Sequence, residues 1–427
     1  MKRLVLFVAF AASFFALATT ASAQYTETTI YNFGAITNDT NSPSVGLIRD
    51  AAGNLYGTSN LGGTGQGTAF ELSFSGGSWT ETILHNFGSV SGDGLQASGG
   101  LIRDSSGNLY GVTQAGGANN QGTVYELSPN SSGWTETILY SFAGNPDVRE
   151  PSGSLIFDAA GNLYGTSFEG GGGTNANCFD GCGTVFELSP SSSGWTEKII
   201  YAFTGGGDGM SPGGNLLFDS AGALYGSAAF GGSVVGAGCF EGCGTVFRLT
   251  PVSGTWRFAR LFNFQGPVGG AAPLWLVFDA AQNIYGVASA GGSGCPGNLG
   301  CGTIFKLTRQ TSPGPWKETV LHSFTELHDG GEPGAGLVFD SSGNLFGSAD
   351  FGGNGNLGTV WELSPTAHGP WKLTQLYSFG DGTTGSRPNS GVIIDPSGNL
   401  YGTAQQGGQF DRGTVFELSP PDGRKSN

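Results

Sequence analysis

Acidic residues recur at one position of the chain and are its most evident candidates for binding chemistry. Most lie four residues before a Pro or an Ala, and the set is Asp39, Asp93, Asp147, Asp208, Asp329 and a displaced Asp381. A ring of carboxylates at a channel mouth could hold a hard cation such as Ca²⁺, or a cationic or polyhydroxylated ligand. The alternative is local, because an Asp ahead of a Pro also caps its own turn through backbone hydrogen bonds.

Six cysteines form three close pairs. They are Cys178 with Cys182, Cys239 with Cys243, and Cys295 with Cys301. In an exported protein, an even number of cysteines in close pairs indicates disulfides, and we predict these three bonds. Zinc is the alternative, since thiolates four residues apart are suitable ligands, but two separate loops would have to converge. We therefore predict no metal at the cysteines.

Catalytic motifs are missing from the sequence. None of its four histidines belongs to a zinc-protease motif, and it has no nucleophile elbow and no phosphate loop. His85 and His322 occupy a position that holds Tyr in other copies of the repeat described below, which predicts packing roles. We predict no catalytic residue. A polysaccharide hydrolase or lyase is the alternative, and its candidate carboxylates would be Asp147, Glu150, Asp329 and Glu332.

The first residues have the features of a signal peptide. Lys2 and Arg3 are followed by an apolar run over residues 4–17 and by the small residues 21–23. Without residues 1–23 the chain has 15 basic and 32 acidic residues, a net charge of −17, which disfavours nucleic acid as a partner. No later stretch has the length and hydrophobicity of a membrane span. We expect a secreted or periplasmic protein.

The elements that position these residues come from one unit that is repeated seven times. Its landmark is Asp-x-x-Gly-Asn-Leu-Tyr-Gly, with small departures such as Ala223, Gln282 and Phe346. The landmark recurs every 54 to 61 residues, starting at Asp50, Asp104, Asp158, Asp219, Asp279, Asp340 and Asp395. Each unit has four strand candidates, a to d, at 155–158, 163–167, 184–188 and 195–203 in the third unit. Strand a is apolar on both faces, whereas strand d alternates like a partly exposed outer strand.

The two chain ends predict how the repeats close. Residues 25–33 form a lone strand d, and the last unit stops after its strand c at 414–418. Each end supplies what the other lacks, so the N-terminal strand should complete the last blade. We predict an all-β, seven-bladed β-propeller of four-stranded antiparallel blades over residues 24–421, followed by a disordered tail at 422–427.

The units resemble the GloVer tandem repeats of bacterial choice-of-anchor exported proteins. The resemblance covers nearly all of the mature chain. It depends on the motifs at 161–166 and 183–190, the Gly pair at 170–171 and the Trp strand, which is the strand d that begins at Trp195 in the third unit. The turn motif alone also resembles that of NHL-type propellers. The family implies export and no specific activity. Family members often carry a C-terminal sorting anchor, which the tail lacks, so we expect release or periplasmic residence.

One face of the predicted disc is the better candidate for function. The b–c and d–a connections emerge on one face, and the a–b turns and c–d links on the other. The b–c loops vary in length, as function-bearing loops on rigid scaffolds do. We expect a monomeric binding module for an extracellular glycan or protein, with a structural envelope role as a further alternative. Phe168, Phe230 and Phe351 would support sugar stacking if exposed, although we expect them to be buried.

Overall fold

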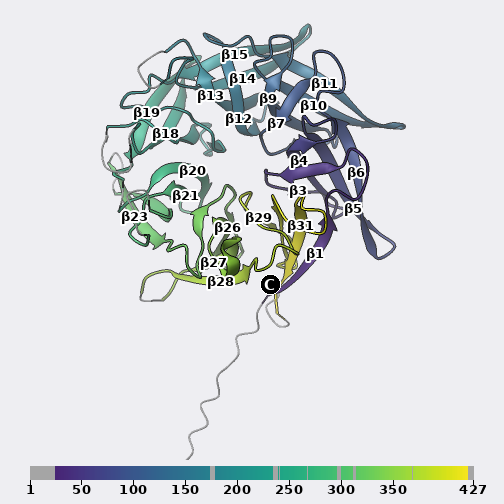
Figure 1. Ribbon diagram of the computed structural model, residues 1–427. Coiled ribbons are helices and arrows are strands. Elements are labelled where there is room, and N and C mark those ends of the chain that lie inside the picture. Colours follow the sequence, from purple (N-terminus) through teal and green to yellow (C-terminus); the bar gives the residue numbers. More distant parts are fainter. Residues whose placement is uncertain are drawn as a thin grey trace, which may run out of the picture.

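Seven antiparallel sheets are arranged radially around a central axis in the computed structural model (Figure 1). The structure describes residues 25–173, 178–233, 239, 241–266, 268–295, 300–310, 314–367 and 369–421. Within these residues it confirms the predicted all-β, seven-bladed propeller. The predicted signal peptide, the C-terminal tail and His368 lie outside the described residues.

The first three blades follow one another along the chain, each running from the axis outward. Blade 1 consists of β2 (Thr40–Pro43), β3 (Ile48–Arg49), β4 (Leu55–Gly62), β5 (Thr68–Ser75) and β6 (Ser78–Asn86). Blade 2 consists of β7 (Gly94–Ala97), β8 (Ile102–Arg103), β9 (Leu109–Gly116), β10 (Thr123–Asn130) and β11 (Gly133–Ser141). Blade 3 consists of β12 (Val148–Phe157), β13 (Leu163–Gly170), β14 (Thr184–Ser191) and β15 (Gly194–Ala202).

The remaining blades continue in the same direction around the axis. Blade 4 consists of β16 (Leu217–Phe218), β17 (Leu224–Ala228), β18 (Thr245–Val252) and β19 (Thr255–Asn263). Blade 5 consists of β20 (Ala271–Phe278), β21 (Ile284–Ala290), β22 (Thr303–Arg309) and β23 (Trp316–Ser323). Blade 6 consists of β24 (Gly331–Pro333), β25 (Val338–Phe339), β26 (Leu345–Phe351), the 3₁₀ turn η1 (Asn354–Asn356), β27 (Thr359–Ser364) and β28 (Lys372–Ser378). Blade 7 consists of β29 (Val392–Ile394), β30 (Leu400–Ala404), β31 (Thr414–Ser419) and β1 (Thr26–Asn32).

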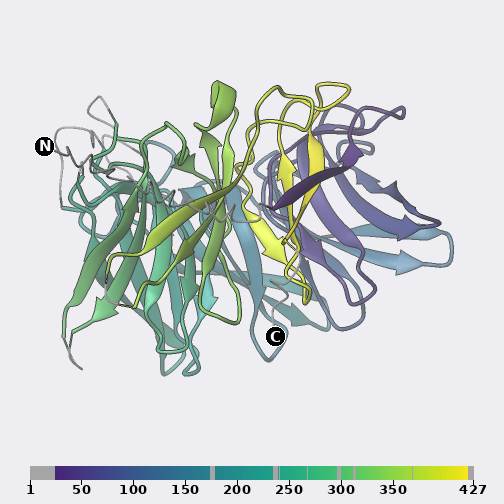
Figure 2. The same cartoon turned by 90° about the horizontal axis from the view of Figure 1, so that it is seen from below.

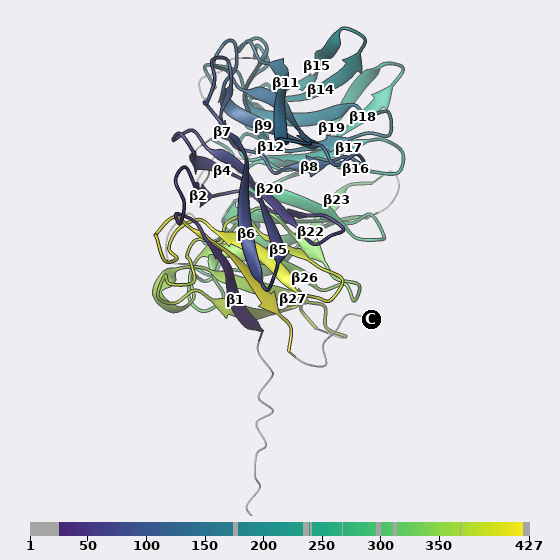
Figure 3. The ribbon, with the colours of Figure 1, turned by 90° about the vertical axis from the view of Figure 1, so that its right-hand side faces the viewer.

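The N-terminal strand closes the ring as predicted. β1 pairs with β31 in antiparallel register from Thr26 opposite Ser419 to Asn32 opposite Thr414, and Figures 1 and 3 show the two strands side by side. Phe33 then turns into the core, where it is fully buried and meets the ring of Phe70 in blade 1 edge-on at 5.1 Å. The first residues of the propeller therefore connect its last blade to its first.

The turn motif owes its shape to its Asp. In blade 3, Oδ1 of Asp158 accepts hydrogen bonds from the backbone N–H groups of Ala160 and Asn162, and Oδ2 accepts one from the Asn162 amide. Gly161 has a φ of 85°, which favours glycine. The Tyr164 hydroxyl also donates to Asp158, at 3.2 Å. The motif is therefore a structural device for the a–b turn.

The glycine at the end of the landmark motif, present in every unit, makes room for a large ring on strand c. A Cβ atom at Gly165 would lie 2.5 Å from the Phe186 ring, which is fully buried beside it. The same crowding occurs between Gly111 and Tyr125 and between Gly347 and the Trp361 ring. A side chain at the Gly position would collide with the ring, which explains why each unit combines this Gly with an aromatic residue on strand c.

The outermost strand differs from its predicted regular alternation. In blade 2 the pairing of β10 with β11 shifts between Val124 and Tyr125, so that Leu139 has no partner opposite it. All seven blades have a register shift at this position. The bulge turns the end of the strand, so that Phe142 is completely buried. In this blade the alternation predicted for strand d therefore holds only up to Ile138.

The innermost strand is longer than predicted where it is continuous. β12 begins at Val148, whereas the sequence analysis placed strand a at 155–158. Its first part pairs with the far end of β13 and its last part with Leu163 and Tyr164, with an irregular stretch between. In blades 1, 2 and 6 the same strand is split into two short pieces. Figure 2 shows the disc from its edge, with connections emerging on two opposite faces.

Among the described residues, no helix has the length and hydrophobicity that crossing a membrane requires.

Candidate functional site

A central cavity of about 320 Å³ lies on the axis of the propeller. All seven blades contribute to its wall, mostly through apolar side chains in or next to the innermost strands. Examples are Leu47, Leu101, Leu155, Leu216, Trp275, Leu337 and Val392. The channel wall is therefore mostly apolar, with Ser154, Asn215 and Ser390 among its few polar residues.

A ring of seven residues with positive φ surrounds one mouth of this channel. Each is a non-glycine residue in or just before the innermost strand of its blade, on the b–c/d–a face, with φ between 50° and 61°. The ring consists of Ser42, Gln96, Glu150, Ser211, Ala272, Glu332 and Arg387. Six of the seven precede a Pro and one precedes an Ala. This conformation costs energy outside glycine and is often found at functional sites.

The ring also joins neighbouring blades. The backbone N–H of Ser211 donates to the carbonyl of Cys182 at 2.9 Å, and that of Glu332 donates to Cys301 at 2.8 Å. Ala272 makes the same bond to Cys243. The second cysteine of each pair thus accepts a hydrogen bond from the next blade. Sequence analysis identified the Pro positions but missed the ring, because a residue before Pro is normally extended.

The three predicted disulfides are present. They join Cys178 to Cys182, Cys239 to Cys243 and Cys295 to Cys301, with Cα–Cα distances of 5.1, 5.0 and 5.7 Å. No cysteine in the described chain is free. Each disulfide fixes a b–c loop directly above the blade interface that its second cysteine helps to form.

A charged cluster lies at the mouth of the channel between blades 6 and 7. The Arg387 guanidinium donates to Asp350 at 2.9 Å and lies 4.0 Å from the centre of the Phe351 ring. Burial raises the pKa of the Asp350 carboxyl, and Arg387 opposes that rise. Burial also raises the pKa of Glu332, together with repulsion from Asp350 and Glu326. The cluster combines an arginine, carboxylates and an aromatic face within reach of solvent.

A second cluster lies on blade 3. Arg149, next to the positive-φ residue Glu150, pairs with Glu169 at 3.1 Å and contacts Asp180 in the disulfide-bonded loop. The Arg149 side chain is 30% exposed. Gln114 of blade 2 donates to Glu150 across the blade boundary at 3.4 Å. Both clusters are on the face that the sequence analysis favoured.

The six predicted Asp residues lie in the d–a connections, where they accept hydrogen bonds from their own turns. Asp147 accepts from the N–H groups of Ala143 and Val148, at 2.8 and 2.7 Å. The other donors are Gly34 and Ile36 to Asp39, Ser89 to Asp93, Thr204 to Asp208, Thr325 to Asp329, and Thr383 to Asp381. These are the bonds expected of turn caps. Ligand binding by the six residues stays a prediction.

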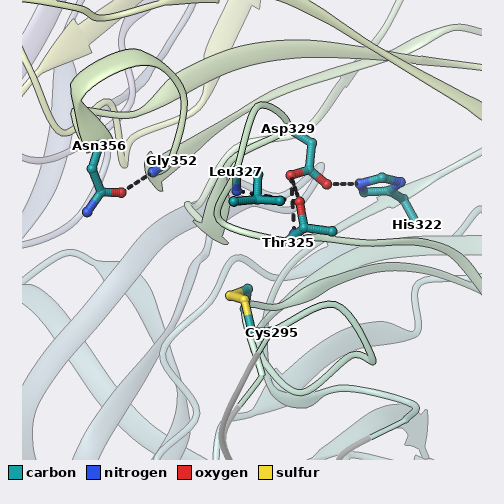
Figure 4. The surroundings of a disulfide bond; sticks show 8 residues. Cys295, His322, Thr325, Leu327, Asp329, Gly352 and Asn356 are labelled. Carbon is teal, nitrogen blue, oxygen red and sulfur yellow. Dashed lines mark hydrogen bonds and ion pairs between the residues drawn. A yellow bond between two sulfur atoms is a disulfide. The ribbon is translucent and has the colours of Figure 1, made fainter.

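Two histidines, His85 and His322, lie against Asp residues of this set. Nε2 of His322 is 2.9 Å from Asp329, whose other oxygen accepts from Thr325 (Figure 4). Burial raises the pKa of Asp329, but the hydrogen bonds from His322 and Thr325 outweigh burial and leave it below its ordinary value. Tyr201 makes the equivalent bond to Asp208 at 3.0 Å. The predicted packing role was therefore incomplete, because these side chains also bond to the turn Asp.

A strand-d glutamate from the following blade completes several of these interfaces. At the boundary of blades 7 and 1, Glu81 accepts hydrogen bonds from Tyr31 at 3.1 Å and Thr40 at 2.6 Å. Burial and a hydrogen bond with Asp39 raise the pKa of Glu81 to about 9. Burial also raises the pKa of the equivalent Glu136, Glu197 and Glu318 to about 7. Sequence analysis missed this group, although the Trp-Thr-Glu motif marks it.

Exposed apolar side chains concentrate on the b–c/d–a face. Of the ten large hydrophobic residues exposed in the described chain, eight lie in or at the edge of its connections: Ile36, Leu61, Val90, Phe179, Phe230, Val268, Leu327 and Phe410. The other two, Phe74 and Val252, are at c–d turns. Of the three phenylalanines considered for sugar stacking, Phe230 is 39% exposed, while Phe168 and Phe351 are half-buried.

The repeats belong to a known family. A family model described as the Gloeobacter/Verrucomicrobia repeat matches residues 13–179, 135–312, 172–369 and 233–426, which together span nearly the whole chain. The chain belongs to this repeat family. A search of curated proteins found no match.

Solved structures similar to this member of the repeat family share its fold. One is a protein assigned as a 6-phosphogluconolactonase from Bacteroides uniformis, with 14% identity and a TM-score of 0.51 over 82% of this chain and 88% of that chain. Another is the extracellular domain of a protein assigned as a hybrid two-component system from B. thetaiotaomicron, with 12% identity and a TM-score of 0.52. That match covers 93% of this chain and 41% of the other. At these identities the likeness concerns the fold alone.

Proposed function

We propose that this repeat protein is an exported binding module that captures an extracellular partner on its b–c/d–a face. The observation that supports the proposal most is the distribution of exposed apolar side chains, eight of ten of which belong to that face. In the described chain the opposite face has only two such side chains, so the b–c/d–a face offers more apolar surface that a partner could cover. Aliphatic residues such as Val90 and Leu327 suit a protein surface, so we favour a protein over a glycan.

The construction of the face fits this role. Three disulfides and the backbone bonds between blades hold the described cysteines and ring residues of this face in place, which lowers the ordering cost of binding there. The arginines Arg149 and Arg387 and their carboxylates offer directional contacts around the channel mouth. The chain without residues 1–23 has a net charge of −17, so it would attract a partner with basic residues.

The same geometry makes hydrolysis the weaker proposal. Two of its candidate carboxylates, Asp147 and Asp329, are engaged in turn caps with their own backbone. The other two, Glu150 and Glu332, lie in different blades on opposite sides of the ring. The export that we infer agrees with the disulfides, which form in oxidising compartments.

The test compares the two faces of the disc. The purified chain is screened against proteins secreted by its own host and against a glycan array, with turnover assays on every glycan that binds. Two variants, Phe179→Ser and Leu327→Ser, remove side chains that are 81% and 67% exposed on the proposed face. The control, Phe74→Ser, removes one that is 60% exposed on the opposite face.

We expect the first two substitutions to weaken binding of a protein partner at least tenfold, by roughly 1.4 kcal/mol or more, and the control to leave it unchanged. Binding that is weakened only by Phe74→Ser would place the interface on the a–b/c–d face and so contradict the proposal. Turnover of a bound glycan would favour the enzyme, and silence in every assay would favour a structural role in the envelope.

A further inference from the structure

One blade interface gathers a histidine and two carboxylates from three different segments. His85 is on β6 of blade 1, Asp93 is in the connection to blade 2, and Glu136 is on β11 of blade 2. Their ligand atoms lie within 4.8 Å of one another. The side chains are 15%, 0% and 9% exposed, respectively. The cluster is thus nearly closed, with its histidine edge accessible to solvent.

The distances in this cluster match those between the ligands of one metal ion. Nε2 of His85 lies 3.2 and 3.1 Å from the two Asp93 oxygens and 3.4 Å from Oε2 of Glu136. Nitrogen and oxygen ligands about 2.0–2.1 Å from a tetrahedral ion are roughly 3.3–3.4 Å apart. An ion could therefore be bound with small side-chain movements.

One oxygen of the second carboxylate lacks a hydrogen-bond partner within the described chain. Oε1 of Glu136 is buried and has no hydrogen-bond partner among the described residues, although the side chain is more than nine-tenths buried. A buried polar atom without a partner is costly, and here it belongs to a carboxylate beside a second carboxylate. A divalent cation would take this oxygen as a ligand and so supply the partner that it lacks.

We propose that His85, Asp93 and Glu136 form a site for a divalent transition-metal ion such as Zn²⁺, which joins blade 1 to blade 2. One imidazole and two carboxylates suit Zn²⁺ or Mn²⁺, whereas Ca²⁺ prefers oxygen ligands throughout. The remaining coordination position is open to water from the exposed side of the imidazole. The role is structural, because the ion joins the outer strands of two blades and lies away from the channel.

The other interfaces show what the site requires. The boundary of blades 2 and 3 has Tyr140 where blade 1 has His85, and the boundary of blades 5 and 6 has His322 and Asp329 with Leu373 in place of the Glu. Among the seven boundaries, only that between blades 1 and 2 has all three ligand types. The chain therefore supplies substitutions that its own scaffold already tolerates.

The test measures metal binding by the full chain with its disulfides intact. After treatment with a chelator and removal of any affinity tag, the protein is titrated with Zn²⁺ by calorimetry, and Co²⁺ is added in parallel as a spectroscopic substitute. We expect one Zn²⁺ per chain and visible Co²⁺ absorption bands typical of tetrahedral coordination. Zn²⁺ should also raise the melting temperature in a concentration-dependent manner.

Two variants and one control locate the ion. His85→Tyr and Glu136→Leu copy residues found at the same position in other blades, and each should weaken Zn²⁺ binding by roughly a hundredfold or abolish it. His322→Tyr, at the interface that lacks the Glu, should bind Zn²⁺ like the original protein. The proposal is overturned if the original protein binds no ion, or if binding survives both substitutions. Melting curves in the absence of metal verify that each variant is folded.

Discussion

The buried carboxyl of Glu81 makes the stability of this propeller depend on pH. The side chain is 8% exposed, between blades 7 and 1, where Tyr31 and Thr40 donate hydrogen bonds to it. Burial and the hydrogen bond with Asp39 raise its pKa to about 9 in the folded state. Oδ1 of Asp39 is buried and has no other partner among the described residues, so the Glu81 proton is the group that can satisfy it. Replacing Glu81 with Gln keeps a neutral donor and acceptor at this position.

The magnitude follows from linkage. The unfolded chain loses the Glu81 proton near pH 4.5 and the folded chain near pH 9, so the contribution is fully present below pH 4.5 and is lost as pH rises toward 9. Each pH unit in this window costs about 1.4 kcal/mol of stability. Between pH 5 and pH 8 the original protein should therefore lose about 4 kcal/mol more than the Glu81→Gln variant.

The assay is urea unfolding at half-unit pH steps from 5 to 8, followed by tryptophan fluorescence with reversibility verified at each pH. The quantity compared is the difference in unfolding free energy between the two proteins, because the other carboxyls contribute equally to both. The control is Glu241→Gln, which removes a charge from an exposed b–c loop residue and should leave the pH dependence unchanged.

One result would refute the reasoning. Parallel pH profiles for the original protein and Glu81→Gln, with or without a constant offset, would mean that the folded protein ionises Glu81 as readily as the unfolded chain does. A constant offset would then measure only the packing and hydrogen bonds of the carboxyl.

Three further predictions concern the scaffold. Tyr125→Phe should raise the unfolding free energy by about 1 kcal/mol in urea titrations, because the fully buried Tyr125 hydroxyl has no hydrogen-bond partner in the described chain. Most other blades have Phe at this position, and destabilisation by the substitution would mean that the hydroxyl has a partner. Phe33→Ala should lower the unfolding free energy by about 3–5 kcal/mol, because Phe33 is fully buried against Phe70. The control Phe74→Ala, at an exposed side chain, should change the unfolding free energy by less than about 0.5 kcal/mol. Equal effects of the two substitutions would contradict closure by the N-terminal strand. Unfolding without reductant should expose no reactive thiol, reductant should lower the melting temperature, and a count near six thiols would contradict the three disulfides.

The repeat made the fold predictable. The Asp-x-x-Gly turn, the strand-c aromatics and the Trp strand recur in register, so four strands per unit, seven units and closure by residues 25–33 could all be predicted from spacing. The three disulfides were predictable for a similar reason, since each pair lies within one loop. Local signals of this kind need no knowledge of the packing between blades.

The candidate sites depended on contacts between units and were mostly missed. Nothing in the sequence around Glu150 indicates its positive φ, because a residue before Pro is normally extended. The bulge at Leu139 rotates the end of strand d by one residue and buries Phe142, which simple alternation could not foresee. The Asp residues were identified, but their partners on the outer strands were not.

The sequence by itself determined the kind and number of the blades, because turn chemistry and strand periodicity act over a few residues and repeat seven times. Only the tertiary structure decided which polar groups meet. Glu81, His85 and Glu136 acquire their partners from the adjacent blade, at a distance of about one repeat along the chain. Burial between two sheets raises the pKa of the Glu81 and Glu136 carboxyls. The packing of blade 1 against blade 2 brings the residues of the proposed metal site together.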